Sequence, residues 1–218
     1  MDPVLLTALV VVANVMGVGM IVPQVARIHR LRSADGVSGV WIGVGIAMNT
    51  WWTIYGLAES LPGILPVSVL AAALYLVMAR QFISLVGRPG WRPLVVGMLV
   101  VGVAPLPALA LGGFTAAGLV VGLAYGLQFF PAVVSAMRSR DCRGVSPLTW
   151  SMALVEAAIW VTYGLASDDR ALLIGGSGGC LASGLILCRL ARVRLRHDGQ
   201  LAADTTGPHV IDGTGSFG

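Results

Sequence analysis

The stretch of sequence that decides the fold occurs twice. Residues 23–58 read PQVARIHRLRSADGVSGVWIGVGIAMNTWWTIYGLA, and residues 131–166 read PAVVSAMRSRDCRGVSPLTWSMALVEAAIWVTYGLA, an offset of 108 without a gap. The identical positions are Pro23/Pro131, Val25/Val133, Arg30/Arg138, Arg32/Arg140, Gly36-Val37-Ser38/Gly144-Val145-Ser146, Trp52/Trp160 and Tyr55-Gly56-Leu57-Ala58/Tyr163-Gly164-Leu165-Ala166. Each copy joins two apolar segments through a basic loop. Such a duplication is typical of membrane proteins with a pathway between two halves.

The composition excludes a water-soluble domain. Of the 218 residues, 56% are hydrophobic and 11% are charged, so there is too little polar surface to cover a soluble core. The net charge is +4, but the arginines lie in short loops between apolar runs, which argues against a nucleic-acid partner. The three cysteines and three histidines show no ligand spacing, so we expect no metal and no cofactor. Membrane lipid is the expected surrounding of most of the chain.

The number of apolar runs sets the expected architecture. A membrane helix needs about 20 apolar residues, and the runs are 3–26, 40–57, 62–83, 93–111, 114–137, 148–165 and 171–190. The fourth run has no counterpart in the repeats and restores the orientation of the second three-helix repeat. We therefore predict an all-α membrane protein with seven transmembrane helices, built as two parallel three-helix bundles (3+1+3) joined by a linker helix. The predicted segments are a first repeat at 3–83, a linker helix at 93–111, a second repeat at 114–190 and a disordered cytoplasmic tail at 191–218.

The arginines predict the orientation of these helices. The chain has no lysine, and along a seven-helix path all arginines except Arg170 fall on the same side of the membrane. The opposite side carries Asp2, Glu59, Asp168 and Asp169. Because cytoplasmic loops carry the excess of positive charge, we expect a multi-pass protein of the cell membrane with an extracellular N-terminus and a cytoplasmic C-terminus.

Three elements of the repeat carry a family resemblance. Pro23-Gln24 at the end of the first run, the basic loop with Gly36-Val37-Ser38, and the Trp52-x-x-Tyr55-Gly56 pattern resemble the PQ-loop family and its SWEET sugar transporters, over about residues 5–190. The resemblance implies a carrier, not an enzyme, that moves a sugar as a uniporter by alternating access. The wider family also implies a proton-coupled transporter of cystine or cationic amino acids, or a non-transporting receptor or adaptor. A monomer contains both halves of a pathway, and the resemblance also allows a homo-oligomer.

Two repeated tryptophans are the first candidates for a solute site. The resemblance implies that Trp52 and Trp160 line a central pocket, where an indole face can support an apolar face of a solute. The alternative is an interfacial belt, which also fits Trp41, Trp51, Trp91 and Trp150. Asn49 precedes Trp52 by three residues and Glu156 precedes Trp160 by four, so each polar side chain shares a helix face with its tryptophan.

Glu156 is the one acidic residue well inside a predicted helix, and three roles are open to it. It can bind a cationic or polyhydroxylated solute, exchange a proton during transport, or form a structural hydrogen bond to another helix. The position equivalent to Glu156 in the first repeat is Met48. The resemblance implies an asparagine on the third helix of each repeat, as in the sugar-transporting members of that family, but this chain has Ser68 and Ser177 in these regions. Both serines can bind solute or serve close packing.

The remaining candidates are hinge and gate residues. Pro23 and Pro131 can kink their helices or end them, and Gln24 has no counterpart in the second copy, where Ala132 follows Pro131. The resemblance implies that Tyr55 and Tyr163 belong to an extracellular gate, to which Asp168 and Arg170 can add a polar latch. An aromatic anchor at the membrane surface is the alternative.

Overall fold

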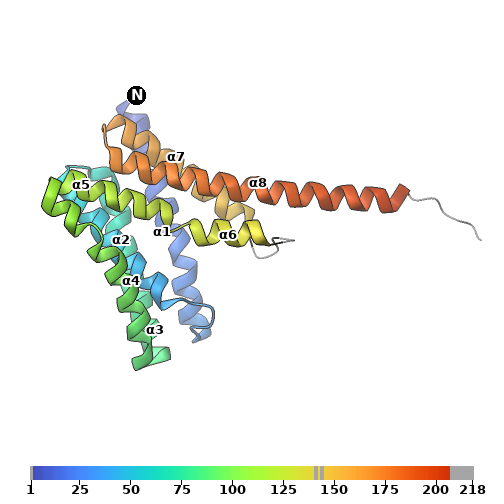
Figure 1. Cartoon of the computed structure of the whole chain (residues 1–218), viewed down its shortest axis with the longest axis horizontal. Coiled ribbons are helices and arrows are strands. Elements are labelled where there is room, and N and C mark those ends of the chain that lie inside the picture. Colours follow the sequence, from blue (N-terminus) through green and yellow to red (C-terminus); the bar gives the residue numbers. More distant parts are fainter. Residues whose placement is uncertain (1, 140–141, 143–144, 207–218) are drawn as a thin grey trace, which may run out of the picture.

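A computed structural model describes residues 2–139, 142 and 145–206, and in this part of the chain the regular structure is helical throughout (Figure 1). The helices are α1 (Pro3–Leu31), α2 (Gly39–Ala58), η1 (Pro62–Ile64), α3 (Leu65–Val86), η2 (Arg88–Gly90), α4 (Trp91–Val103), α5 (Leu106–Leu127), α6 (Phe130–Arg138), α7 (Pro147–Ala166) and α8 (Arg170–Thr206). The expected all-α class is therefore confirmed.

The repeated Gly-Val-Ser motif starts a helix in both copies. Ser38 accepts a hydrogen bond from the backbone N–H of Trp41, 3.3 Å away, and Ser146 accepts from that of Thr149 at the same distance. Each serine thus satisfies one of the N–H groups that a helix start leaves without a partner. The duplicated loop is a repeated N-cap that sets where α2 and α7 begin.

Proline and glycine divide two of the expected helices. The run predicted at 93–111 ends as α4 at Val103, and α5 begins at Leu106 directly after Pro105. The run predicted at 114–137 is divided between α5 and α6, with Pro131 in the first turn of α6. The interruptions at Pro105 and before Pro131 were not predicted, because hydropathy does not register the hydrogen bond that a proline removes. The boundary predicted between 111 and 114 coincides with a kink that joins two helices within α5. Within α5, Gly112 and Gly113 depart from helical geometry, with φ +68° at Gly113.

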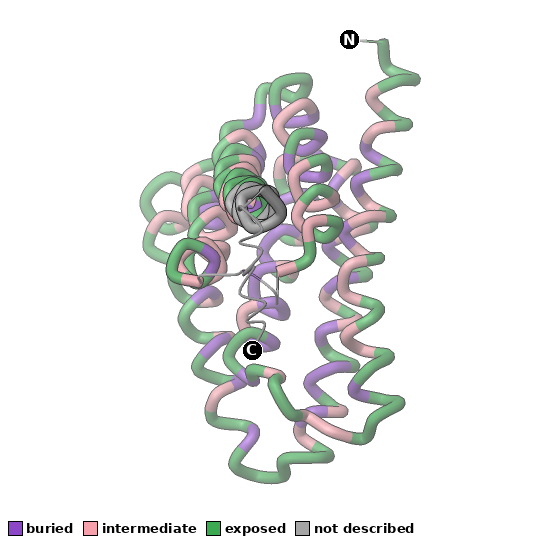
Figure 2. Tube along the Cα trace, turned by 90° about the vertical axis from the view of Figure 1, so that its right-hand side faces the viewer, coloured by how far each residue is buried: buried purple, intermediate pink, exposed green. Residues whose placement is uncertain are grey.

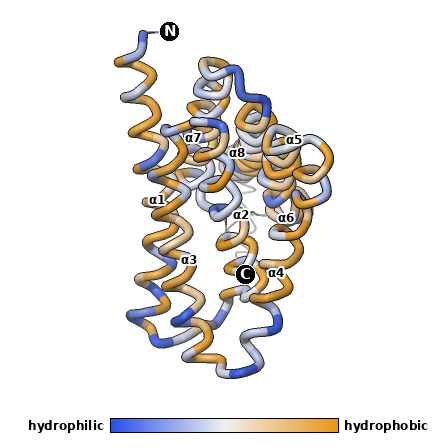
Figure 3. The backbone as a smooth tube through the Cα atoms, turned by 90° about the vertical axis from the view of Figure 1, so that its left-hand side faces the viewer, coloured by the Kyte–Doolittle hydropathy of each residue, from blue (hydrophilic) through white to orange (hydrophobic). Residues whose placement is uncertain are grey.

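Much of the helical surface is apolar, as a membrane protein requires. Five helical segments of the described chain are long and apolar enough to cross a membrane: Pro3–Leu31, Pro62–Val86, Leu106–Arg138, Pro147–Ala166 and Arg170–Leu195. The outside carries large apolar side chains such as Leu111, Leu148 and Leu181, each more than half exposed, and hydrophobic positions dominate the helices in Figure 3. In water such a surface would aggregate, so the chain is suited to lipid.

The seven expected crossings are not all matched by a long helix. The fourth expected crossing is divided at Pro105 into α4, which has 13 residues, and the first turns of α5, which end at the kink of Gly112 and Gly113. α2 has 20 residues but is not among the five segments that combine sufficient length with sufficient hydropathy. The expectation of a membrane protein is thus confirmed at the level of several apolar helices.

Helix contacts arrange the chain in two groups. α3 contacts α1 and α2, while α8 contacts α5, α6 and α7; α4 packs on α2. Between the groups, α1 contacts α7 and α2 contacts α5. Figure 1 shows α3 and α4 running down the picture and α8 running across it, and in Figure 2, turned by 90°, α8 runs toward the viewer. The two groups therefore diverge from the region in which they touch.

The buried apolar residues explain this divergence. Among the described residues, one core cluster draws on both groups, a second lies within α1–α4, and a third lies around α6 and α8. The first, which we name the shared cluster, consists of Val10, Ala13, Ala47, Met48, Trp51, Trp52, Tyr55, Leu61, Ile64, Val101, Ala117, Val121, Ile159, Trp160, Tyr163, Ala171 and Leu172. The groups share a core at one end, the joined end, and have separate cores elsewhere.

Helix α8 continues beyond the expected end of the last membrane run. It extends to Thr206, so the change to a disordered tail predicted at residue 191 is not observed as far as Thr206. The rest of that predicted tail, 207–218, lies outside the described residues, as do Arg140 and Gly144 of the duplicated loop.

Candidate functional site

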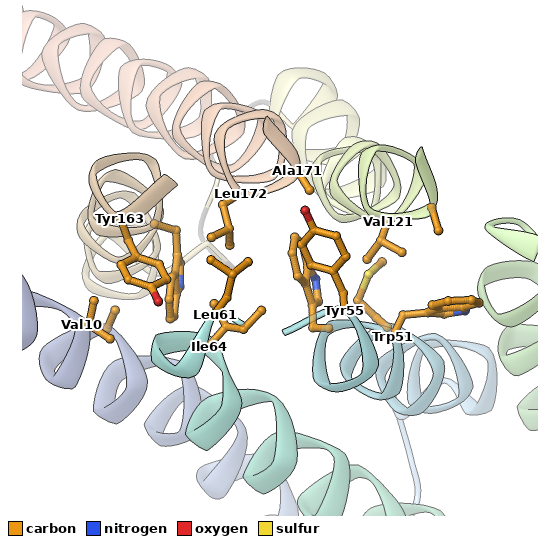
Figure 4. Packing of buried hydrophobic residues seen from close by; sticks show 14 of the residues in the cluster. Val10, Trp51, Tyr55, Leu61, Ile64, Val121, Tyr163, Ala171 and Leu172 are labelled. Atoms are coloured by element: carbon orange, nitrogen blue, oxygen red, sulfur yellow. The ribbon is translucent and has the colours of Figure 1, made fainter. Parts of the chain in front are cut away.

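A cavity of about 700 Å³ lies between the two helix groups. Its wall is built from α1, α2, α3, α5, α6, α7 and α8, so both copies of the repeat contribute. At the joined end it reaches Ile64 and Leu172 of the shared cluster, which Figure 4 shows packed between the helices. In the other direction it extends to Ser38 and Thr149, at the starts of α2 and α7. A cavity of this size can hold a small solute.

Five of the six predicted solute-binding residues line this cavity: Asn49, Trp52, Ser68, Glu156 and Trp160. They come from α2, α3 and α7, and the structure brings them together from positions up to 111 residues apart (49 to 160). Ser177 is the exception: it is exposed on α8, while its neighbours Gly175 and Gly176 line the cavity. Successive residues of a helix point about 100° apart. The sequence therefore predicted the correct turn of α8 but not which side of this turn faces the cavity.

Glu156 is the buried polar centre of the site. Its side chain is 6% exposed, and its Oε1 accepts a hydrogen bond of 3.2 Å from the indole N–H of Trp160, one turn further along α7. This bond lies within one helix, whereas the structural role considered above required a bond to another helix. Gly17 of α1 makes room for the carboxylate, because a Cβ at that position would lie 2.6 Å from Oε1. Two halves of the chain thus create this pocket for one oxygen.

The polar side chains of the first repeat are already engaged. The amide of Asn49 donates to the carbonyl of Gly45 at 2.8 Å, within α2. Ser68, which is 2% exposed, donates to the carbonyl of Leu65 and accepts from the hydroxyl of Thr53 at 3.0 Å. Ser68 is therefore engaged by its neighbours, whereas among the described residues Asn49 uses one of its two N–H groups and keeps its amide oxygen for other partners.

Aromatic rings form much of the cavity wall, including several that the sequence did not single out. The lining rings are Trp41, Trp52, Tyr75, Tyr125, Phe129, Trp150 and Trp160. Trp41 and Trp150, for which a membrane belt had been expected, belong to this wall; they occupy non-equivalent positions in the two repeats, so the duplication did not mark them. Trp51 was also expected in the belt but is buried and donates to the carbonyl of Gly102 on α4 at 3.0 Å.

The two predicted gate tyrosines lie at the joined end and each contacts the other helix group. Tyr55, at the end of α2, donates a hydrogen bond of 2.5 Å to Asp169, which precedes α8. Tyr163, at the end of α7, accepts one of 3.1 Å from the backbone N–H of Gly63 in η1, which precedes α3. We name this pair the two tyrosine contacts. Figure 4 shows the hydroxyl of Tyr55 pointing toward the start of α8.

Asp169 is a residue that sequence reasoning missed, because Asp168 and Arg170 were considered for a polar latch. Both of these neighbours are exposed. Asp169 is 9% exposed and uses both carboxylate oxygens: one accepts from Tyr55, and the other accepts from the backbone N–H of Leu172 at 2.8 Å. Asp169 lies two residues before the apolar run that was predicted to begin at 171. An Asp just before a helix is a typical N-cap, and this signal could have identified it.

The predicted hinge residues behave differently in the two repeats. Pro23 is exposed inside a continuous α1, which ends eight residues later at Leu31, so this proline does not end its helix. Gln24 is half-buried and does not line the cavity. Pro131 lines the cavity next to the break between α5 and α6. Pro23 thus lies within an unbroken helix, whereas the equivalent Pro131 lies next to an interruption between helices.

The site holds no arrangement that would ligate a metal: among the described residues, no three His, Cys, Asp or Glu side chains are grouped closely enough. No protein-family model matches the sequence, and no curated protein matches it significantly.

Proposed function

We propose that the chain is a membrane carrier that moves a small solute by alternating access between two three-helix bundles. The observation that carries this proposal is the cavity of about 700 Å³ built jointly by both copies of the repeat. A receptor or adaptor would function with a dry, packed centre, whereas a carrier needs a central space that both halves line. The cavity therefore favours the carrier over the third alternative considered above.

The pattern of helix contacts supports the 3+1+3 arrangement. In this arrangement α1, α2 and α3 form the first bundle, and α4 with the first turns of α5, up to Leu111, forms the linker. The rest of α5 with α6, α7 and α8 forms the second bundle. The duplication makes α5 the copy of α1, and α7 the copy of α2. If each helix is exchanged with its copy, the contact of α1 with α7 becomes the contact of α5 with α2, and both contacts are present. Such an exchange is what a pseudo-twofold axis between parallel bundles requires.

The distribution of cores suggests how access would alternate. The bundles are closed at the joined end by the shared cluster and the two tyrosine contacts, and they diverge at the end that carries Arg27, Arg30 and Arg138. With the arginine-bearing side in the cytoplasm, this is an inward-facing state. Breaking the tyrosine contacts while the arginine-bearing ends approach one another would expose the cavity to the other side. The break before Pro131 is a natural place for such a motion.

The solute classes to be tested follow from the resemblance to PQ-loop and SWEET proteins. A sugar uniporter is the first form of the proposal, with Trp52 and Trp160 as the supporting surfaces. A proton-coupled amino-acid transporter is the second form. The observation in its favour is the buried carboxylate of Glu156 within a membrane helix.

Uptake into proteoliposomes tests the carrier. The purified full chain is reconstituted and given labelled glucose, sucrose, cystine, lysine and arginine, with and without an imposed pH gradient. Trp52→Ala and Trp160→Ala should abolish uptake, whereas Trp91→Ala, which removes an exposed indole outside the cavity, should not. Flux of sugar that ignores the pH gradient supports the first form, and pH-driven amino-acid flux lost in Glu156→Gln supports the second. Equal flux in empty vesicles and in vesicles with folded protein would contradict both forms.

A further inference from the structure

We infer that the solute is a small organic monocation without a carboxylate, held by Glu156 among the aromatic rings of the cavity. This inference rests on the proposed carrier function, and it names a substrate class different from the sugar and the amino acid that the resemblance implies. It starts from the charges that line the site: among the described lining residues Glu156 is the single acidic side chain, and none is Arg, Lys or His. A cavity with one carboxylate and no basic group is electrostatically complementary to a monocation.

The surroundings of Glu156 leave its charge to be neutralised by the solute. The side chain is 6% exposed, and the hydrogen bond from Trp160 is the one that the described residues provide to it. A buried carboxylate is unfavourable unless it takes up a proton or an opposite charge pairs with it. A zwitterionic amino acid would supply an ammonium group but would also bring its own carboxylate, for which the described lining residues offer no cationic partner.

The cavity wall suits the apolar groups of such a cation. Trp52, Tyr125, Phe129 and Trp150 form a continuous row of edge-to-face neighbours, with ring centroids 6.2, 5.4 and 6.2 Å apart. Aromatic faces attract ammonium groups, and methylated ammonium ions are bound in proteins by rings of this kind. A row of four rings beside a single carboxylate thus offers both components of a binding site for an organic cation.

A polyhydroxylated solute makes larger demands on the same wall. A sugar that leaves water needs hydrogen-bond partners for its hydroxyl groups. Ser68 already bonds to its own helix and to Thr53, and Asn49 uses one N–H on the carbonyl of Gly45, so the remaining polar groups of the lining would have to serve every hydroxyl. An alkylated ammonium ion needs few such partners, so the engaged polar groups do not count against it.

Ligands that differ in charge but not in shape provide the test. Binding of choline, its neutral isostere 3,3-dimethylbutan-1-ol and the zwitterion glycine betaine is measured with the full chain in nanodiscs, by isothermal titration calorimetry. The proteins are the wild type, Glu156→Gln and the matched control Glu59→Gln, in which a carboxylate outside the cavity is replaced. Uptake of choline and of glucose is measured in proteoliposomes of the same preparations.

We expect choline to bind at least about tenfold more tightly than either the neutral isostere or the betaine. Glu156→Gln should remove this preference and Glu59→Gln should retain it; if Glu156→Gln fails to fold, the comparison of ligands on the wild type remains decisive. Equal binding of choline and its isostere, or uptake of glucose without any binding of choline, would overturn the inference while leaving the carrier intact. Binding of choline without flux of either solute would support the site and contradict the carrier.

Discussion

Tyr55 and Tyr163 occupy equivalent positions in the two repeats, yet replacing each by phenylalanine should have unequal effects. The Tyr55 hydroxyl donates to a carboxylate oxygen of Asp169 over 2.5 Å, and both side chains are buried. A hydrogen bond to a charged group contributes about 1.5–3 kcal/mol. The Tyr163 hydroxyl accepts from the neutral backbone N–H of Gly63 over 3.1 Å, which corresponds to about 0.5–1.5 kcal/mol.

The assay for this difference is thermal unfolding in detergent, followed by circular dichroism. For a chain of this length each kcal/mol moves Tm by roughly 2–4 °C, so Tyr55→Phe should lower Tm by roughly 3–12 °C and Tyr163→Phe by roughly 1–6 °C. Tyr75→Phe is the control, because Tyr75 is equally buried but the described residues provide no hydrogen-bond partner for its hydroxyl.

A double-mutant cycle with Asp169→Ala isolates the contact itself. In that background Tyr55→Phe should cost little, since the carboxylate that accepted the bond is gone. A loss as large as in the wild type, or a larger effect of Tyr163→Phe than of Tyr55→Phe, would refute the assignment of the stronger tyrosine contact to Asp169.

Three further substitutions test the packing around the site. Gly17→Ala should lower uptake and cost about 1–3 kcal/mol of stability, because a Cβ there would lie 2.6 Å from Glu156. Gly19→Ala on the same helix is the control and should be neutral, because its Cβ would meet nothing within 4 Å. Equal effects of the two substitutions would contradict the tight fit. Asn14→Leu should lower Tm clearly, because the Asn14 amide joins α1 to η1 and α3 through bonds of 2.9 and 2.6 Å; an unchanged Tm would show that this joint contributes nothing. Trp51→Phe should cost about 0.5–1.5 kcal/mol in chemical unfolding, since it leaves a carbonyl in the last turn of α4 without its indole partner, and no measurable cost would indicate that another donor replaces the indole.

Much of the site could be predicted because it depends on local spacing. Residues three or four apart on a helix share a face, and this placed Asn49 with Trp52 and Glu156 with Trp160 before their surroundings were known. Ser68, which was predicted to bind solute, also lines the cavity. Spacing alone did not assign the face of α8, and Ser177 was therefore expected in a wall to which Gly176 belongs.

Local helix continuity was predicted less well. Hydropathy placed a boundary between 111 and 114, where Gly112 and Gly113 do leave helical geometry. It did not reveal the interruptions at Pro105 and before Pro131, nor that Pro23 lies within a continuous helix. A proline always removes one backbone hydrogen bond; whether the helix then breaks or only bends depends on whether neighbouring groups hold the two parts together.

The sequence by itself determined the helical class, the internal duplication, the apolar surface suited to lipid and the pairs of polar and aromatic residues that share a helix face. These properties follow from composition and from periodicity within single helices, which act over a few residues. Only the tertiary structure decided that Tyr55 meets Asp169 rather than its neighbours, and that Trp41 and Trp150 face a common cavity. It also decided that Gly17 leaves space for Glu156. Such contacts join segments roughly 100 residues apart, and they depend on how whole helices pack, which no local pattern specifies.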